Sequence, residues 1–258
     1  MRPNVMLRKL RQGQVAVCPL LVYGAPDLAE QVAHLGFDGV FIDGQHGSWT
    51  EPGLLDVLGR FLATDCTPLV RVRAADPAAV NFALDMGAQG VVVPMVQTAE
   101  QARLAVQGAY YPPAGQRSGG GARLGLLGDG VMDYFARAND ETLLVVMLET
   151  EAAIDNAEAI AGVPGVDVLL IGPGDLAIDA RARGRDEAHV ERLVERVAAV
   201  ARRAGLVAGY VCGTPEAAQR RIAQGFRFLC YGSDWGVVDA GFRRLRDESR
   251  AWAAPGGA

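Results

Sequence analysis

The sequence predicts an α/β protein, a (β/α)8 TIM barrel formed as one domain over residues 1–258. Three observations lead to this fold class. Half of the 258 residues are hydrophobic, which is enough for one large core, and no linker divides the chain. Short apolar runs rich in β-branched residues alternate with longer stretches of helical periodicity, as in a parallel sheet. Eight such pairs occur, which is the number that closes a barrel.

The expected strands are short apolar runs, most of them followed by a polar or turn residue. They are Val15–Leu21, Gly39–Ile42, Leu69–Val72, Gly90–Val93, Leu143–Glu149, Val168–Ile171, Leu206–Val211 and Phe226–Tyr231. Four of them share one plan, in which a glycine ends the preceding helix and a buried strand follows, at 36–43, 87–94, 165–172 and 225–232. An open doubly wound sheet could use similar units, so this repeat alone does not decide between the two folds.

Helical periodicity fills the segments between the strands. The expected helices are Ala25–Leu35, Leu54–Ala63, Ala78–Met86, Ala99–Gln107, Glu151–Ala161, Glu187–Ala204, Pro215–Gln224 and Val237–Ala253. One long stretch, Tyr110 to Asp140, shows no regular pattern and contains the glycine-rich segment Ser118–Gly121. A loop of this length is either a surface excursion or a lid that contacts substrate, and the sequence leaves both open.

Composition argues against several classes of function. The net charge of −5 gives no reason to expect nucleic acid or an anionic membrane as a partner. No apolar run is long enough to span a bilayer and the first residues do not resemble a signal peptide, so we expect a cytoplasmic protein. The four cysteines lie far apart and three sit within apolar runs, which favours buried thiols over disulfides.

Polar residues gather where the expected strands end, and barrel active sites lie at that end. Glu149 and Asp175 follow consecutive strands, which are about 4.8 Å apart in a sheet. Two carboxylates that close repel unless a proton or a cation lies between them, and an all-oxygen site favours Mg²⁺ or Mn²⁺. The alternatives are a helix N-terminal carboxylate for Glu149 and an N-cap for Asp175. Their pairing on neighbouring strands favours a metal site.

Three more polar residues fall on the same rim. His46, in the loop after the second strand, suits acid–base chemistry, although a single loop histidine is more often structural. Asp43 could fix the tautomer of His46. Arg71 could stabilise a developing oxyanion, or form a salt bridge with Asp43. Asp85, late in a helix, has the pattern of a solvated charge.

Six motifs, in order along nearly the whole chain, resemble one enzyme family. They are Ile-Asp-Gly-Gln-His at 42–46, Val-Arg at 70–71, Val-Pro-Met-Val-Gln at 93–97, Tyr-Pro-Pro-Ala-Gly at 111–115, Leu-Glu-Thr-Glu-Ala at 148–152 and Ile-Gly-Pro-Gly-Asp-Leu at 171–176. The sequence is similar to the HpcH/HpaI family of class II 2-oxo-acid aldolases. The resemblance implies reversible cleavage of 4-hydroxy-2-oxo acids to pyruvate, or hydroxypyruvate, and an aldehyde, with Mg²⁺, Mn²⁺ or Co²⁺ as cofactor.

The resemblance also implies roles at the donor site. Glu149 and Asp175 match the ligands of the metal, and Arg71 matches the residue that contacts the pyruvyl oxygen. The backbone of Gly174 and Asp175 matches the turn that holds the pyruvate carboxylate. The single lysine of the chain, Lys9, precedes the first strand. Since a Schiff-base aldolase needs a lysine in its pocket, an aldolase with this sequence needs a metal as its electron sink.

Other roles concern proton transfer and assembly. His46 matches the family's base, which acts through a water molecule. Asp43 and Asp85 match acidic residues near this histidine, and Asp85 would reach the site of a neighbouring subunit. Family members are typically hexamers in which the last helix packs on a neighbour's barrel, so the resemblance implies a homo-oligomer in which Val237–Ala253 does the same.

Departures from the family pattern concern the acceptor aldehyde. Gln45 stands where many members have glutamate, and Met147 stands where glutamine is frequent. These variants also resemble a branch that accepts hydroxypyruvate or pyruvate, and the Ser118–Gly121 segment differs from the heptanedioate enzymes. Apolar Val211 would shape the acceptor side of the substrate site together with Gln45.

Two alternatives stay open at this stage. One is an acyl-CoA lyase of the malyl-CoA or citramalyl-CoA type, which would need a basic surface for the CoA phosphates. Arg117 and Arg123 are the only candidates the sequence suggests for such a surface. The other is a barrel that binds an oxo acid without catalysis.

Overall fold

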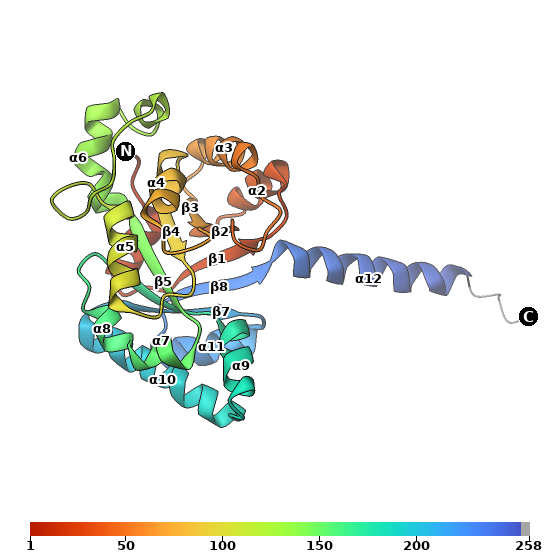
Figure 1. The fold of residues 1–258 in the computed structure, drawn as a ribbon. Coiled ribbons are helices and arrows are strands. Elements are labelled where there is room, and N and C mark those ends of the chain that lie inside the picture. The colour runs from red at the N-terminus through yellow and green to blue at the C-terminus, as the bar shows by residue number, and fades with distance from the viewer. Residues whose placement is uncertain (254–258) are drawn as a thin grey trace, which may run out of the picture.

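The computed structural model describes residues 1–253, and its strands form one closed parallel barrel (Figure 1). The strands are β1 (Ala16–Leu21), β2 (Gly39–Asp43), β3 (Thr67–Arg71), β4 (Gly90–Val93), β5 (Leu143–Leu148), β6 (Val168–Ile171), β7 (Val207–Cys212) and β8 (Phe228–Ser233). Each strand pairs with the next, and β8 closes the barrel against β1. The fold class predicted from the sequence is confirmed. The predicted strand ends differ from these by no more than two residues.

Helices precede, connect and follow the strands. They are α1 (Val5–Arg11), α2 (Pro26–Ala33), α3 (Glu51–Arg60), α4 (Pro77–Asp85), α5 (Ala99–Ala109), α6 (Val131–Glu141), α7 (Glu151–Asp155), α8 (Ala157–Ala161), α9 (Pro173–Ala182), α10 (Glu187–Ala204), α11 (Pro215–Ala223) and α12 (Asp234–Ala253), with two 3₁₀ turns, η1 (Phe61–Ala63) and η2 (Ala122–Leu126). Side-chain caps begin many of them; Thr98 and Gln101, for example, form a capping box at the start of α5.

The stretch from Tyr110 to Asp140 was expected to be irregular, and this was wrong in part. It contains η2 and most of α6, whose Tyr134 and Ala138 are buried. The segment connects the end of α5 to the start of β5, so it lies at the amino-terminal ends of the strands. Barrel active sites lie at the other end, so within one chain this segment is a packed surface excursion and not a lid over the chain's own site.

Helix α9 was also missed by the sequence analysis, which expected only a turn. Its apolar residues do not form a regular stripe, and only Leu176 and Ala180 are buried. Since hydrophobic periodicity is the main signal for a helix in a sequence, a short helix without it is not detected.

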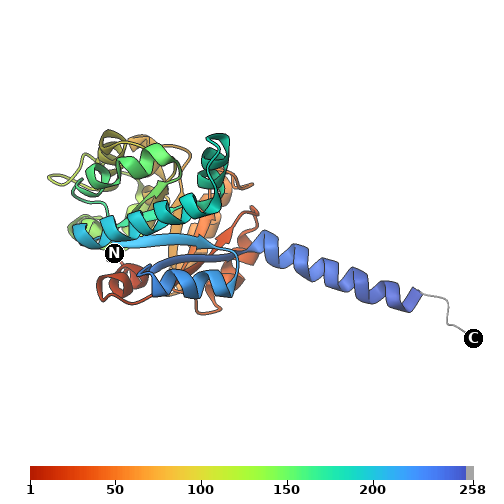
Figure 2. The same ribbon diagram turned by 90° about the horizontal axis from the view of Figure 1, so that it is seen from below.

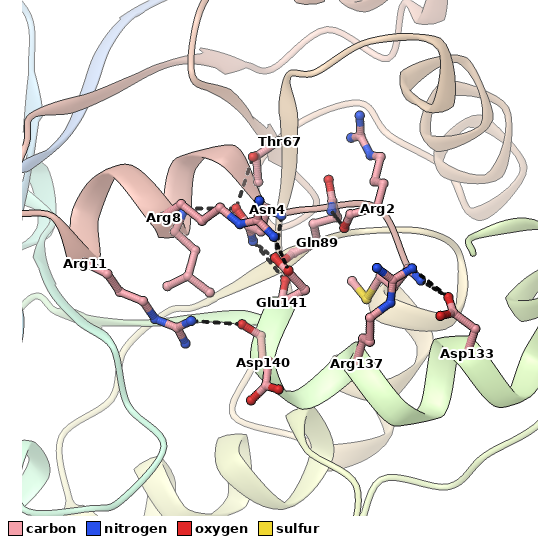
Figure 3. A network of polar contacts seen from close by, with 12 residues as sticks. Arg2, Asn4, Arg8, Arg11, Thr67, Gln89, Asp133, Arg137, Asp140 and Glu141 are labelled. Atoms are coloured by element: carbon pink, nitrogen blue, oxygen red, sulfur yellow. Dashed lines mark hydrogen bonds and ion pairs between the residues drawn. The ribbon is translucent and has the colours of Figure 1, made fainter. Parts of the chain in front are cut away.

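Helix α1 closes the amino-terminal end of the barrel and had not been predicted. Its Met6, Leu7 and Leu10 join the apolar cluster inside the barrel. A buried polar network holds it there (Figure 3). Asn4 donates to the backbone oxygens of Gln89 (2.9 Å) and Glu141 (3.0 Å), and the Glu141 carboxylate accepts from the backbone of Asn4. These contacts close the amino-terminal end of the barrel interior.

Helix α12 leaves the barrel instead of packing on it (Figures 1 and 2). The carboxylate of Asp234 accepts hydrogen bonds from the backbone of Val22 and Tyr23, both at 2.9 Å, and so ties the start of the helix to the end of β1. None of the helices within residues 1–253 combines the length and the hydrophobicity that crossing a bilayer requires. All four cysteines are buried and unbridged, as the sequence indicated.

Candidate active site

Three charged side chains point into the barrel at the carboxyl ends of the strands. Phe41, Leu69 and Met147 belong to the apolar cluster inside the barrel. Because side chains alternate across a strand, Asp43, Arg71 and Glu149, each two residues further on, face the same interior. They are exposed by only 1%, 8% and 2%. Charged groups this deeply buried are stable only when other groups compensate their charge. The hydrogen bonds and ion pairs that these three side chains form therefore define the candidate site.

Asp43 and Arg71 form a two-pronged ion pair across β2 and β3. Arg71 donates from Nε to Oδ1 of Asp43 at 2.8 Å and from Nη2 to Oδ2 at 2.7 Å. The same Oδ1 accepts from the backbone of Gln45 and His46, both at 3.1 Å. Burial would raise the pKa of Asp43, but the guanidinium and the two N–H groups outweigh it and lower that pKa. Asp43 therefore stays ionised and fixes both Arg71 and the start of the His46 loop.

The remaining nitrogen of Arg71 has no strong acceptor. Its Nη1 lies 3.9 Å from Sδ of Met147, and a thioether accepts a hydrogen bond only weakly. The guanidinium carbon lies 5.6 Å from the centre of the Phe41 ring, which adds a cation–π contact. With Nε and Nη2 occupied by Asp43, Nη1 is left to bind an oxyanion.

Glu149 is held by the backbone on two sides. Its Oε1 accepts from the backbone N–H of Met95 at 2.9 Å. Leu148 pairs with Ile171 in the barrel, so Glu149 lies beside Gly172. A Cβ atom built on Gly172 would lie 2.5 Å from Oε2 of Glu149, which shows how closely the carboxylate packs on that backbone. Glycine is required there because any side chain would displace Glu149.

The structure brings Asp175 next to Glu149, as predicted from their places on consecutive strands. Asp175 lies in the first turn of α9 and is exposed, whereas Glu149 is buried. Burial is the largest cause that raises the pKa of Glu149, to about 7, and the charge and hydrogen bond of Asp175 raise it further. The Met95 N–H and Arg71 act in the opposite direction. A proton or a cation between the carboxylates would relieve this repulsion.

The residues at this position fit a hard divalent cation. Both donors are carboxylates, and Glu149 packs in a cradle at Gly172 that a Cβ atom would fill. Within the described part of the chain, no cluster of three or more His, Cys, Asp or Glu side chains forms a metal site. Water or substrate oxygens would therefore complete the coordination, which leaves positions open for chemistry.

The first turn of α9 adds an anion-binding feature. Gly172 is the N-cap, and Pro173, Gly174 and Asp175 form the first turn. N–H groups at the start of a helix have no partner within the helix and point towards the solvent beyond it. A substrate carboxylate next to Glu149 and Asp175 could accept hydrogen bonds from the backbone N–H groups of Gly174 and Asp175.

The other residues predicted for the site lie around its opening. His46 is exposed, and its backbone N–H binds Asp43. Among the hydrogen bonds of the described residues, none joins the His46 ring to Asp43, so the contact expected to fix its tautomer is absent there. Gln45 is half-buried and its Oε1 has no partner. Val211 faces inwards on β7, next to Gly172 on β6, and is half-buried.

Comparison with known proteins decides the family. Residues 21–239 match the HpcH/HpaI aldolase/citrate lyase family. The chain belongs to this family. It is similar to a 4-hydroxy-2-oxovalerate aldolase from Novosphingobium aromaticivorans, with 39% identity over 256 residues that cover 96% of this chain and 97% of that protein.

Two further relatives agree with this assignment. A hydroxypyruvate/pyruvate aldolase from Chromohalobacter salexigens is 40% identical over 210 residues, which cover 80% of this chain and 82% of that one. A crystal structure of an HpcH/HpaI aldolase/citrate lyase family protein from Burkholderia cenocepacia has a TM-score of 0.86 at 29% identity and covers 96% of this chain and 99% of its own. The HpcH/HpaI chain described here is a lyase, and relatives of its family act on 2-oxo acids.

Asp85 of this HpcH/HpaI protein lies away from the other predicted site residues. It ends α4, which runs from the carboxyl ends of the strands towards their amino ends. Its carboxylate accepts from Nη2 of Arg117 at 2.8 Å and from Nδ2 of Asn81 at 2.6 Å. The sequence pattern predicted that Asp85 would be a solvated charge, and this was wrong, because Asp85 forms a salt bridge with the fully buried Arg117.

The two arginines considered for a CoA surface are both used inside this HpcH/HpaI protein. Arg117 is buried and lies over the rings of Tyr111, at 4.6 Å, and Tyr134, at 5.5 Å. Arg123 donates to the backbone oxygens of Met86 and Leu55. Neither gives the acyl-CoA alternative the exposed charge that it requires.

Two positions of the HpcH/HpaI site were missed from the sequence. Met95 acts through its backbone N–H, and Gly172 acts through the absence of a side chain. Side-chain chemistry does not point to either residue. The only sequence signal is that both lie in motifs shared with the family, at 93–97 and 171–176.

Proposed function

We propose that this protein is a divalent-metal-dependent aldolase that cleaves 4-hydroxy-2-oxo acids to pyruvate, or hydroxypyruvate, and an aldehyde, and that also catalyses the reverse addition. The observation that carries the proposal is the pair of carboxylates, Glu149 and Asp175, in contact at the open end of the barrel. Relatives named as aldolases for 4-hydroxy-2-oxovalerate and for hydroxypyruvate or pyruvate support the substrate class.

Glu149 and Asp175 would hold the cation, for which Mg²⁺, Mn²⁺ and Co²⁺ are the candidates. When bound, such an ion acts as a Lewis acid that stabilises negative charge on the donor's oxygens. Lys9, the single lysine, pairs with Asp38 at 2.8 Å and so is not in the site, which leaves no residue for a Schiff base.

The donor oxo acid is bound by this chain's own N–H groups. Those of Gly174 and Asp175 at the start of α9 receive its carboxylate. Nη1 of Arg71 donates to its keto oxygen, and the bond strengthens as that oxygen gains the charge of an enolate. Asp43 keeps Arg71 in place through its two hydrogen bonds, so no reorganisation is needed during the reaction.

Cleavage needs a proton to leave the C4 hydroxyl. His46, exposed at the opening, accepts this proton through a water molecule while the C3–C4 bond breaks. The electron pair of that bond moves into the donor carbonyl and gives an enolate and a free aldehyde. Protonation at C3 then completes the new molecule of pyruvate. Addition follows the same steps in reverse.

The acceptor aldehyde would lie towards Val211 and Gln45. Val211 supplies an apolar wall beside Gly172, and the unpaired Oε1 of Gln45 can accept a hydrogen bond from a hydroxyl group. A small acceptor with an apolar end and a neighbouring hydroxyl fits these two groups.

A homo-oligomer is part of the same proposal. Along α12, Trp235, Val238, Phe242 and Leu245 recur at intervals of three and four residues, which places them on one side of the helix. Several of its apolar side chains are largely exposed, including Phe242 at 69% and Trp252 at 80%. An isolated helix gains little stability of its own in water, so α12 would pack on the barrel of a second copy. Asp85 would approach a neighbour's site in such an assembly.

The test is aldehyde release from a series of 4-hydroxy-2-oxo acids, measured after EDTA treatment and after addition of Mg²⁺, Mn²⁺ or Co²⁺. We expect cleavage only with metal, and a loss of at least about 100-fold in Glu149→Ala. Glu158→Ala is the matched control, because Glu158 is an exposed glutamate on α8. Full metal-dependent turnover in Glu149→Ala would contradict the assignment.

A further inference from the structure

Met95 has the one strained backbone conformation among non-glycine residues in the described part of the chain, with φ of 54°. In this left-handed region the Cβ atom approaches the following carbonyl oxygen, so residues other than glycine avoid it. Such a conformation persists only where the surrounding structure imposes it, and it is found most often at functional sites.

The chain on both sides of Met95 imposes this conformation. Val93 ends β4, and Pro94 restricts its own φ and keeps Val93 extended. Just beyond the turn, the N–H of Val96 donates to the backbone oxygen of Met147 on β5 at 3.1 Å. Val93 and Val96 are thus both fixed and lie only three residues apart, so the chain between them must turn sharply from β4 over the end of β5.

The turn determines the direction of the backbone N–H group of Met95. The N–H of Met95 points at Oε1 of Glu149, 2.9 Å away. The other oxygen of that carboxylate, Oε2, packs against Gly172. One hydrogen bond and one steric contact thus fix the orientation of the Glu149 carboxylate beside Asp175.

The side chain of Met95 has a smaller part in this arrangement. It is 38% exposed, so packing makes little demand on its shape. A glycine would adopt the same turn without strain. Met95 therefore holds this conformation at a cost, and the anchored residues on both sides of it, not its own side chain, point its N–H at Glu149.

We propose that Met95 is a positioning residue, whose left-handed backbone orients the Glu149 carboxylate for the cation before the cation binds. This inference rests on the metal site of the proposed function. It assigns the role to the main chain of residue 95 and not to the thioether.

The test is the dissociation constant for Mn²⁺ of the full-length chain, measured by counting free Mn²⁺ with electron paramagnetic resonance. Met95→Ala and Met95→Gly keep the backbone N–H and should bind within about twofold of the wild type. Met95→Pro removes the N–H and excludes the left-handed conformation, so it should weaken binding about tenfold, as loss of support for a metal ligand does. Ala74→Pro, in the exposed loop after β3, is the control for an added proline and should leave binding unchanged.

Thermal unfolding without metal separates positioning from misfolding. Met95→Gly should unfold at the wild-type temperature or above it, because the left-handed strain is relieved, and Met95→Pro should still unfold in one cooperative transition. Equal Mn²⁺ affinity in Met95→Pro and wild type would overturn the proposal, and so would a tenfold loss in Met95→Gly. If Glu149→Ala binds Mn²⁺ as the wild type does, the metal site itself is wrong, which is a separate result.

Discussion

At the scale of single residues, the site depends on groups that hold charges in place. Removing one partner of a buried ion pair such as Asp43–Arg71 typically costs about 3–5 kcal/mol, because the other charge is left without compensation. The pair is retained here at the mouth of the barrel, where it directs Nη1 of Arg71 towards the interior and fixes the loop that carries His46. Arg71 thus has a structural partner on one side and a free N–H group on the other.

Gly172 permits a prediction at this scale. Its φ of −91° suits any residue, so an alanine would cause no backbone strain. The added Cβ would however meet Oε2, Cγ and Cδ of Glu149 at 2.5, 2.9 and 3.0 Å. We expect Gly172→Ala to fold normally and to bind Mn²⁺ at least about tenfold more weakly, measured by isothermal titration calorimetry.

A second glycine in the same turn provides the control. A Cβ atom built on Gly174 meets no atom within 4 Å. Gly174→Ala should therefore bind Mn²⁺ as the wild type does, although it lies only two residues away. If both variants bound the ion equally well, the close packing of Glu149 on Gly172 would have no bearing on the metal.

At the scale of elements, the strands and the short helices before and after them have separate tasks. The strands bring the charged residues to one end, α1 closes the other end, and α9 begins beside the carboxylates of Glu149 and Asp175. Helix α12 is different, because it has no contact surface on its own barrel along most of its length (Figure 2).

The exposed side of α12 leads to a prediction about assembly. Replacing Phe242 and Leu245 together by aspartate would place two charges within the proposed contact with a second copy. Loss of two large apolar side chains from such a contact costs at least about 2 kcal/mol, or about 30-fold in the dissociation constant. We expect the double variant to have a lower mass than the wild type by size-exclusion chromatography with light scattering.

A charge on the opposite side of the helix distinguishes a contact from a general effect. Ala240 is exposed and lies about half a turn away from the stripe that contains Phe242 and Leu245. Ala240→Asp should keep the wild-type mass. An unchanged mass in the double variant would mean that α12 does not hold the copies together.

At the scale of the whole molecule, folding brings two carboxylates together in a place where water is largely excluded from one of them. The pKa of Glu149 rises to about 7 from an ordinary value of 4.5. Between these values the folded chain holds a proton that the unfolded chain has lost. The contribution of Glu149 to stability is therefore complete below pH 4.5 and is lost as the pH rises through 7, by about 3 kcal/mol in all.

The loss of stability with rising pH gives a prediction for the metal-free protein. Its free energy of unfolding should fall by about 2 kcal/mol between about pH 5.5 and about pH 8 on account of Glu149 alone. Urea unfolding in EDTA would show this fall in the wild type and a smaller one in Glu149→Gln, while Glu158→Gln should behave as the wild type. Added Mn²⁺ should stabilise the protein more at the higher pH, because the ion and the proton compete for one carboxylate. An equal fall in Glu149→Gln and wild type would contradict the raised pKa.

Much of the candidate site could be predicted from the sequence because its residues follow buried strands. Asp43, Arg71, Glu149 and Asp175 were identified from their places at strand ends, and the structure brings all four to one end of the barrel. Helix α1 was missed because it spans only seven residues, α9 because its apolar residues form no regular stripe, and α6 because it lies within the stretch that was expected to be irregular.

The sequence by itself therefore determined the barrel, the end at which its chemistry lies and the carboxylate pair, because alternation and periodicity along the chain set which side chains face inwards. Only the tertiary structure decided that Asp43 binds Arg71 with both oxygens, that Asp85 binds Arg117, and that the backbone at Met95 and Gly172 holds Glu149. Those contacts join residues up to 54 positions apart and partly involve main-chain atoms. Their geometry depends on how the strands are registered in space, which no local pattern in the chain records.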